Sequence, residues 1–260
     1  MEIVEESIYD HPKYYDLVFN ADCAAETKFI LGCAEHYLSR AAVRFFEPAC
    51  GTGRLLYSLA KRGHEIGGLD LNPLAVEFCN ARLERHGLPY RAFVADMSDF
   101  RLSKKADIAF NTINSFRHLP SERAAKAHLT CVAQSLRKNG LYLLGVHLTP
   151  TEAEPSDGEA WSARRGNLSI NTNMWTNSRD PAARIERFGI RFDIHRPSGT
   201  LRIEDELVLR SYTKKQMNSL IKATKCWEVI ETFDFGYDLN DPIEVDAETE
   251  DVVYVLRKTA

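Results

Sequence analysis

One stretch, from Val43 to Asn72, limits the possible folds of this chain more than any other. An apolar run ends in Glu47-Pro48, and a small-residue loop at 49–53 (ACGTG) follows it. An amphipathic run at helical spacing comes next, and a second short run ends in the acid Asp70. Strand, glycine turn, helix, strand and acid together predict a nucleoside site. Glycines let the backbone approach a ligand, a helix N-terminus offers free N–H groups, and a carboxylate accepts hydrogen bonds from ribose hydroxyls.

The residues around the turn distinguish between classes of nucleoside. A dinucleotide fingerprint needs G-x-G-x-x-G, whereas here Gly51-x-Gly53 is followed by Leu56 where the third glycine should stand. An acid, Glu47, ends the strand before the turn. A carboxylate there would repel a pyrophosphate but would suit a ligand that carries an ammonium and a sulfonium. Glu47 could equally be a residue that only structures the turn.

At these residues the chain resembles the class I S-adenosylmethionine-dependent methyltransferases, whose first motif is usually E/D-x-x-x-G-x-G. Ala49 stands where many members have an earlier glycine. The resemblance implies S-adenosyl-L-methionine as the cofactor and methyl transfer as the activity. It implies that Ala49, Gly51 and Gly53 contact the methionine part of the cofactor and that Arg54 pairs with the methionine carboxylate. It also implies that Glu47 favours the cationic end of the cofactor and that Asp70 binds the ribose.

The next strand ends in another acid at the same edge of the expected sheet. A third strand, from Tyr90 to Ala95, leads into Asp96-Met97. Because the carboxyl ends of parallel strands meet at one edge, we expect Asp96 beside Asp70. The resemblance implies that Asp96 binds the adenine amino group and that the backbone of Met97 reaches a ring nitrogen. Leu71, directly after the ribose acid, is a further predicted cofactor contact.

A polar segment follows the fourth expected strand, Asp107 to Asn111. We expect Asn111 at the cofactor, because ligands of open α/β sheets sit at this rim. The S-x-x-H-L pattern at 115–119 resembles methyltransferases that act on amino groups of small molecules such as amino sugars, where a histidine faces the substrate. His118 is therefore the predicted general base, since an unperturbed pKa near 6.5 suits taking a proton from an ammonium or hydroxyl. A purely structural loop histidine is the alternative.

After the fifth expected strand, Leu141 to His147, the chain departs from a minimal fold of this class. Residues 151–166 are polar and read as a loop, and three alternating runs follow at 168–176, 184–195 and 201–210. They predict a three-stranded antiparallel lid over the rim, which would exclude water from methyl transfer. The candidate substrate contacts are Arg117, His147, Trp161 and Trp175, with Arg164, Arg165 and Arg210 as further candidates, and packing or surface charge is the alternative for each.

The predicted fold class is α/β: a Rossmann-like seven-stranded sheet with helices on both faces, plus the inserted lid. Residues 1–150 form the cofactor-binding core with an N-terminal helical segment, 151–212 the lid, and 213–260 the rest of the core with a helix and two strands. Tyr15, in the N-terminal segment, could close over the cofactor or could pack that segment onto the domain. Gly140 is expected as the left-handed cap of the helix before the fifth strand.

The composition narrows the class of partner. The net charge is −4 without a Lys/Arg block, which disfavours nucleic acid. The six cysteines are scattered and indicate reduced thiols in a cytoplasmic protein. Neither a signal peptide nor a membrane span is recognisable, and the eight histidines follow no metal-binding pattern. We therefore expect a small-molecule methyl acceptor, and the sequence indicates no oligomeric state.

Three alternatives stay open. The chain could methylate a protein or nucleic acid, although it has NTIN at 111–114 rather than an N/D-P-P-Y motif. It could be a non-enzymatic protein that binds S-adenosylmethionine or a partner on the same scaffold. It could be a nicotinamide oxidoreductase, which the missing third glycine disfavours.

Overall fold

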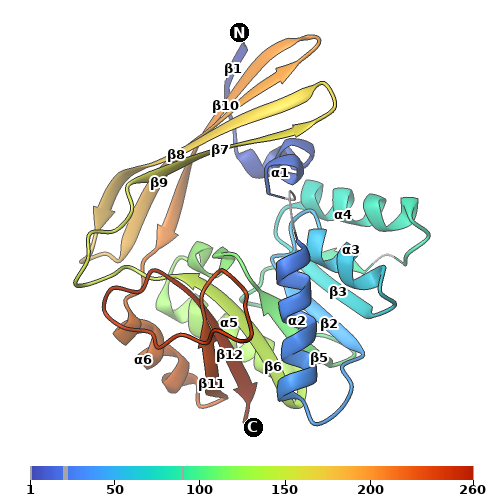
Figure 1. Ribbon diagram of the computed structural model, residues 1–260, viewed down its shortest axis with the longest axis vertical. Coiled ribbons are helices and arrows are strands. Elements are labelled where there is room, and N and C mark those ends of the chain that lie inside the picture. The colour runs from blue at the N-terminus through green and yellow to red at the C-terminus, as the bar shows by residue number, and fades with distance from the viewer. Residues whose placement is uncertain (1, 20–22, 90, 260) are drawn as a thin grey trace.

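The computed structural model describes residues 2–19, 23–89 and 91–259, and its larger sheet has the predicted Rossmann-like architecture (Figure 1). Seven strands lie in the order β11-β12-β6-β5-β2-β3-β4. Five adjacent strands, β6, β5, β2, β3 and β4, run parallel to one another. Strand β12 is antiparallel to both β6 and β11. The bounds are β2 (Arg44–Pro48), β3 (Glu65–Asp70), β4 (Ala92–Val94), β5 (Ala106–Asn111), β6 (Leu136–His147), β11 (Trp227–Phe233) and β12 (Asp251–Lys258).

Helices cover both faces of this sheet, because each presents an apolar stripe to it. The residues of one core cluster come from the sheet and from α2 (Ala24–Tyr37), α3 (Arg54–Ala60) and α4 (Pro73–Arg85). Those of the other come from the opposite face and from α5 (Glu122–Ser135) and α6 (Lys214–Thr224). Three short helical segments lie at the carboxyl rim of the sheet, namely η1 (Ile8–Asp10), α1 (Pro12–Phe19) and η2 (Ser115–His118).

The helix ends mostly follow the local signals in the sequence. The Asn72 side chain accepts a hydrogen bond from the Leu74 N–H at 2.8 Å and so begins α4 at Pro73. The end of α5 differs from the expectation, because Asn139 and not Gly140 has the positive φ, at 58°. The strand that follows begins at Leu136, before the expected Leu141, so this turn lies within β6. In the third expected strand, Tyr90 lies outside the described residues.

The inserted sheet has five strands where three were expected. Its order is β1-β10-β9-β8-β7, with β8 (Leu168–Asp180), β9 (Ile185–Arg196) and β10 (Gly199–Arg210) as the three expected strands. The fourth, β7 (Gly158–Arg165), lies where the polar sequence predicts a loop. It is an edge strand with mostly exposed side chains, so its sequence shows no apolar alternation. The fifth, β1 (Glu2–Glu5), pairs in parallel with β10, and its paired residues are 199 positions apart in sequence, from Glu2 with Leu201 to Glu5 with Glu204. Local sequence patterns cannot reveal such a pairing.

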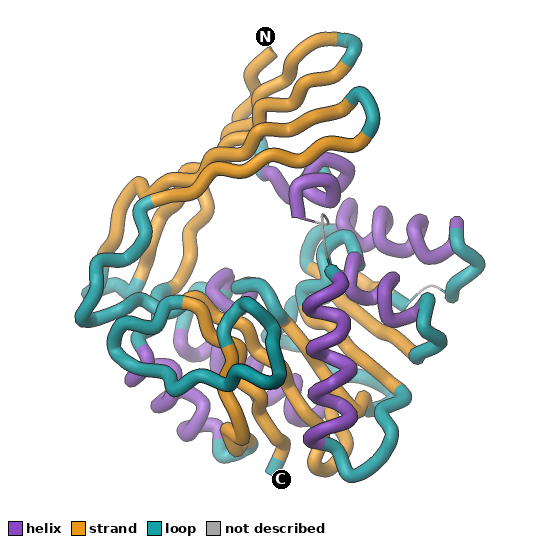
Figure 2. The backbone as a smooth tube through the Cα atoms, in the orientation of Figure 1, coloured by secondary structure: helices purple, strands orange, loops and turns teal. Residues whose placement is uncertain are grey.

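This second sheet extends over the carboxyl rim of the larger sheet. Figure 2 shows its long strands rising from the rim and bending across the top of the molecule, where the chain also starts. Helix α1 contacts β7 and β8 on one side and α4 on the other. Apolar residues from β8, β9, β10 and α1 form a separate core cluster. None of the helices in the described ranges combines the length and apolar character that crossing a bilayer requires.

Candidate active site

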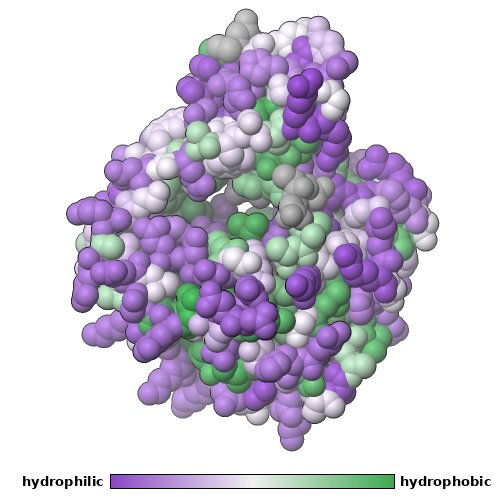
Figure 3. Space-filling view, viewed as in Figure 1, coloured by the Kyte–Doolittle hydropathy of each residue, from purple (hydrophilic) through white to green (hydrophobic). Residues whose placement is uncertain are grey.

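A cavity of about 1380 Å³ lies between the carboxyl rim and the second sheet, and Figure 3 shows a hollow between these two parts of the molecule. Its walls come from the glycine turn, the ends of β3 and β4, the η1–α1 segment, the rim after β5 and the inner face of the second sheet. One space therefore joins most of the predicted cofactor and acceptor residues. Those that line it are Tyr15, Ala49, Gly51, Asp70, Leu71, Asp96, Met97, Arg117, His118, His147 and Trp161.

The glycine turn has the conformation that its residues suggest. Gly51 and Gly53 have φ of 51° and 71°, a region that glycine enters without penalty. A Cβ at Gly51 would meet no atom within 4 Å, which leaves this backbone open to a ligand, whereas one at Gly53 would overlap the Cys79 thiol. Ala49 also has a positive φ, 54°, where the earlier family glycine is missing. An alanine in this region carries a strain of about 1 kcal/mol.

Asp70 is held by the backbone on either side of it. One carboxylate oxygen accepts from the Gly51 N–H at 2.7 Å, and the other accepts from the Asn72 N–H at 2.9 Å. Burial raises the pKa of Asp70, and these backbone hydrogen bonds oppose that shift. The acid therefore fixes the glycine turn as well as facing the cavity. Beside it Leu71 is 71% exposed, an apolar side chain left uncovered at the cavity wall that could pack on a planar ring.

Four of the predicted cofactor residues lie behind the cavity wall. Arg54 forms a two-armed ion pair with Glu26 of α2, with its Nη2 2.7 Å from Oε1, so its guanidinium is already engaged. Glu47 is buried, and its Oε2 has no hydrogen-bond partner among the described residues. The Asn111 amide donates to the Pro48 carbonyl at 2.8 Å, while its Oδ1 has no partner in the described part of the chain. Gly53, closed by Cys79, completes this group.

The structure adds Tyr9, which the sequence reasoning did not select, to the predicted His118. The Tyr9 hydroxyl lies 3.0 Å from His118 Nε2, and both residues line the cavity. The His118 side chain is exposed towards the cavity, and its packing against the cavity walls lowers the pKa of the imidazole to about 4. The charge of Arg117 adds to this shift, and Asp205 opposes it. His118 is therefore neutral at physiological pH. Tyr9 could have been found only by knowing that η1 crosses the rim.

His147 stands between two carboxylates that were also missed. Its Nδ1 lies 2.8 Å from Asp251 Oδ1, and its Nε2 lies 3.5 Å from Glu250 Oε2. These acids precede or begin β12, and because that strand is antiparallel its start meets the end of β6 at the carboxyl rim. Within the described ranges, no group of three or more His, Cys, Asp or Glu side chains is arranged to hold a metal ion.

Two predicted acceptor contacts are differently engaged. Arg117 borders the cavity, but it is buried and its guanidinium pairs with Glu186 and donates to the Arg210 carbonyl at 2.9 Å. Trp175 does not line the cavity; it donates to Asn177 Oδ1 at 2.8 Å and packs where a side chain at Gly189 would stand. Its indole therefore covers the outer side of the second sheet, since the residue before it, Met174, faces the cavity.

Comparison with known proteins agrees with the resemblance to methyltransferases that the sequence shows. Residues 46–140 match the family described as "Methyltransferase domain". These residues contain the glycine turn, Asp70, Asp96 and the rim segment with His118. This part of the chain is a methyltransferase domain.

Solved structures of similar fold cover nearly the whole of this chain. An S-adenosylmethionine-dependent methyltransferase of Clostridium acetobutylicum ATCC 824 has a TM-score of 0.78 at 17% identity, over 96% of this chain and 98% of that one. CalS10, an amino pentose methyltransferase of Micromonospora echinaspora, has a TM-score of 0.73 at 17% identity over 100% of both chains. KedS8, a sugar N-methyltransferase of Streptoalloteichus sp ATCC 53650, has a TM-score of 0.74 at 16% identity over 99% and 95%.

One curated protein is similar in sequence. It is GWCH70_2453 of Geobacillus sp. (strain WCH70), which is named only provisionally as a methyltransferase. The two chains are 26% identical over 137 residues, which is 52% of this chain and 56% of the relative. This chain therefore aligns with a little more than half of the curated relative's length.

The site fits S-adenosylmethionine, the cofactor of the methyltransferases that the chain resembles. The open backbone at Gly51 and the uncovered Leu71 offer a close approach and an apolar surface. Asp70 and Asp96 supply carboxylates at the cavity wall. The cofactor's ammonium is a donor, and two buried acceptors behind the turn, on Glu47 and Asn111, lack partners in the described part of the chain.

Proposed function

We propose that this chain transfers a methyl group from S-adenosylmethionine to an amino nitrogen of a small molecule. The observation that carries the proposal is the single cavity that runs from Asp70 and Asp96 past His118 and under the second sheet. A space closed on the far side by a sheet suits a small acceptor better than a protein or nucleic acid surface. The names of similar structures, an amino pentose methyltransferase and a sugar N-methyltransferase, agree with a nitrogen target.

In this proposal the glycine turn and the acids hold the cofactor. Asp70 would bind the ribose hydroxyls, Asp96 and the Met97 backbone the adenine, and Glu47 and Asn111 the ammonium. Tyr15, on the cavity wall, would cover the cofactor. Arg54 would act through Glu26 rather than by direct contact, because its guanidinium is already paired. The second sheet, residues 151–212 together with β1, would act as the lid.

When bound, S-adenosylmethionine supplies an electrophilic methyl group on a sulfonium. The chain's own part is alignment and exclusion of water, which together convert an encounter in solution into an in-line approach. With Nε2–H donating to the Tyr9 hydroxyl, Nδ1 of His118 would accept a hydrogen bond from the acceptor's N–H and so point the nitrogen lone pair at the methyl. Since the pKa of His118 is lowered to about 4, the imidazole is a poor base for an alkylammonium and a good neutral acceptor. We therefore favour orientation over proton removal as its main role.

Calorimetric titration with S-adenosylmethionine, S-adenosylhomocysteine and NAD tests the cofactor site first. We expect both sulfur ligands to bind and NAD not to bind. Asp70→Ala should weaken both sulfur ligands at least tenfold, about 1.4 kcal/mol, because it removes a ribose acceptor and loosens the turn. Asp99→Ala is the matched control, since this exposed acid lies outside the cavity. Binding of NAD alone would overturn the proposal in favour of an oxidoreductase.

A screen of small amines with labelled S-adenosylmethionine then tests the transfer itself. If His118 orients the acceptor, His118→Asn should retain more activity than His118→Phe, because the amide oxygen can still accept a hydrogen bond. Turnover should show no inflection near pH 6.5 from this residue. Tight cofactor binding without transfer to any amine would favour the non-enzymatic alternative.

The six free thiols also lead us to propose a cytoplasmic location, testable by fractionation.

A further inference from the structure

We infer that the methyl acceptor is a diamine with an apolar carbon skeleton and no phosphate group. One of its nitrogens is methylated near His118, and the second, cationic nitrogen binds to Glu250 and Asp251. This inference rests on the proposed function, and it concerns the acceptor end of the same cavity. Three features of that end carry it, namely the placing of its charges, an adjoining acidic pocket and an apolar wall.

The acceptor end lies across the sheet from the cofactor residues. The cofactor residues follow β2, β3 and β4, whereas His147 and Asp251 lie on β6 and β12, on the other side of β5. His118, which follows β5, therefore lies between the two ends in the order of the strands. A ligand that reaches both His118 and Asp251 extends away from the cofactor along the rim.

Carboxylates outnumber free cations at this end. Glu250 and Asp251 both face the one imidazole of His147, and Glu159 adds a third acid from β7. Glu250 is held in place, since its Oε1 accepts from the Ser156 N–H at 3.2 Å. The positive charge of Arg117 is already paired with Glu186.

Only one other arginine, Arg123, is among the described residues that line the cavity, and no lysine is. A phosphate or diphosphate on the acceptor would therefore meet more repulsion than attraction. A cationic group would find two carboxylates with one shared partner.

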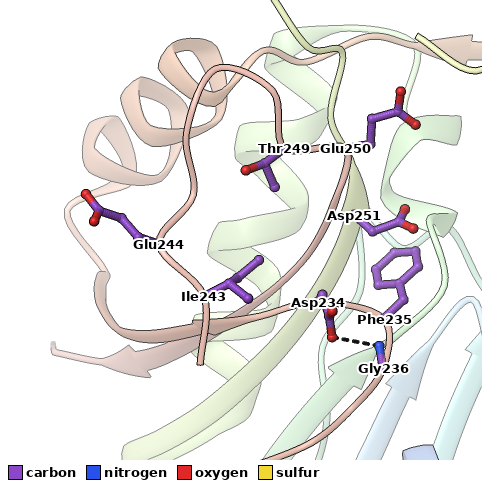
Figure 4. A pocket seen from close by; sticks show the side chains of 8 residues that line it. All are labelled: Asp234, Phe235, Gly236, Ile243, Glu244, Thr249, Glu250 and Asp251. Carbon is purple, nitrogen blue, oxygen red and sulfur yellow. Dashed lines mark hydrogen bonds between the residues drawn. The ribbon is translucent and has the colours of Figure 1, made fainter. Parts of the chain in front are cut away.

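A second pocket of about 640 Å³ extends the acidic surface outward. It shares Phe235, Glu250 and Asp251 with the main cavity and adds Asp234 and Glu244. Figure 4 shows Glu250 and Asp251 next to each other, with the Phe235 ring beside Asp251 and Glu244 on the opposite side of the pocket. Acids that line an approach to a site raise the local concentration of cations there.

The carboxylates cannot serve the nitrogen that reacts. An ammonium has no lone pair, and a pair of carboxylates around it would keep it protonated and so unreactive. The reacting nitrogen must be neutral, which fits the neutral His118 at the other end. The acids therefore bind a nitrogen other than the one that is methylated, which makes the acceptor at least a diamine.

The body of the acceptor would lie on the inner face of the second sheet. Alternate residues of adjacent strands point to this face, because side chains alternate along a strand. Its cavity-lining apolar side chains are Trp161, Met174, Phe188, Ile190, Leu207 and Leu209. Such a wall favours methylene or ring carbons over hydroxyls, which would be left without partners.

Calorimetric binding to the protein saturated with S-adenosylhomocysteine tests the inference. The probes are 1,8-diaminooctane, 1-octanol, 8-aminooctanoate and uridine diphosphate. We expect the diamine to bind at least tenfold more tightly than 1-octanol, which carries no charge, 8-aminooctanoate to bind more weakly than the diamine, and uridine diphosphate not to bind. Equal affinity for the diamine and 1-octanol, or preference for the nucleotide, overturns the inference.

Variants assign the effect to named residues. In Glu250→Gln combined with Asp251→Asn, the diamine should lose its tenfold preference over 1-octanol, while the affinity for the uncharged 1-octanol stays unchanged. Glu244→Gln, which changes the same charge in the adjoining pocket only, should keep the preference. Unchanged S-adenosylhomocysteine affinity and melting temperature show that each variant is folded. Retention of the preference in the double variant contradicts the inference.

The two proposals fail in different ways. If the diamine preference is present and depends on the two acids but no amine is methylated, the proposed function fails and the assignment of the ligand class stands. If amines are methylated without any preference for a second nitrogen, the proposed function stands and this inference fails.

Discussion

Thr52, in the middle of the glycine turn, donates a hydrogen bond from its hydroxyl to Asp16 of α1 at 3.0 Å, and both side chains are buried. The same Asp16 oxygen pairs with Arg82 of α4, and its other oxygen lies 3.8 Å from Arg165 of β7. The residue before Asp16, Tyr15, lines the cavity. One carboxylate therefore ties together the cofactor turn, the N-terminal helix and the second sheet.

Asp16→Asn should destabilise the protein by about 3 kcal/mol, because it leaves Arg82 buried without a counter-charge. Urea unfolding measures this loss. S-adenosylhomocysteine should also bind several-fold more weakly, since Thr52 loses its charged acceptor. Arg165→Ala should change stability by no more than about 0.5 kcal/mol, because Arg165 is largely exposed and its pair is long. Equal losses in the two variants would contradict this account.

The two glycines of the turn should respond differently to the same substitution. Gly51→Ala adds a methyl group in open space at a positive φ and should cost about 1 kcal/mol. Gly53→Ala has the same backbone penalty and also forces the new methyl onto the Cys79 thiol, so about 1–3 kcal/mol more is expected. Unfolding midpoints compare the variants. Gly53→Ala combined with Cys79→Ala should recover part of the difference; no recovery would rule out the overlap as its cause.

Buried His128 should make stability fall in acid. Its Nδ1 lies 2.8 Å from the Met97 carbonyl, which can only accept, so Nδ1 carries the proton and Nε2 accepts from the Tyr142 hydroxyl at 2.7 Å. Burial lowers the pKa of His128 to about 4 from 6.5, so the unfolded chain binds more protons between these values. Stability is therefore full above pH 6.5 and falls as pH drops towards 4, by on the order of 3 kcal/mol from this group.

Unfolding in urea at pH 7.5 and pH 4.5 measures that difference. His128→Gln should reduce it while lowering stability at pH 7.5, because a glutamine cannot take up the proton. His118 adds a fall of the same sign, since its pKa is also lowered to about 4, so some pH dependence should remain. His36→Gln, an exposed side chain in α2, should leave the difference unchanged. An unaltered difference in His128→Gln would falsify the assignment.

The Arg117–Glu186 pair should behave as a buried link between the rim and the second sheet. Glu186→Gln leaves the Arg117 guanidinium uncompensated and should cost about 3–5 kcal/mol. Replacing both residues by methionine should recover most of that loss, because a buried pair exchanged for apolar side chains is often nearly neutral. Urea midpoints test both statements. If Arg117 instead served mainly as a substrate contact, Glu186→Gln would change acceptor KM with little change in stability.

Features fixed by neighbouring residues were predictable from the sequence. The glycine turn, the acids at the ends of β3 and β4, and the Asn72 cap each depend on residues within one turn or one strand end. The Thr213 capping box is of the same kind, with both of its reciprocal hydrogen bonds formed. The partners lie a few residues apart in the two caps and 19 residues apart within one strand–turn–helix–strand motif in the Gly51–Asp70 hydrogen bond, so spacing alone is informative.

The tertiary structure decided which polar groups are engaged and which face the cavity. Arg54 pairs with Glu26 and Arg117 with Glu186, so neither guanidinium is available in the way that its position in the motif suggested. Tyr9 meets His118 across 109 residues of sequence. The edge strands β1 and β7 carry no periodic signal, because exposed faces do not require apolar residues. The sequence alone thus determined the glycine turn and the acids at the strand ends, which short motifs specify. Only the fold determined which side chains gather around His118 and His147, because their partners come from segments far apart in the chain.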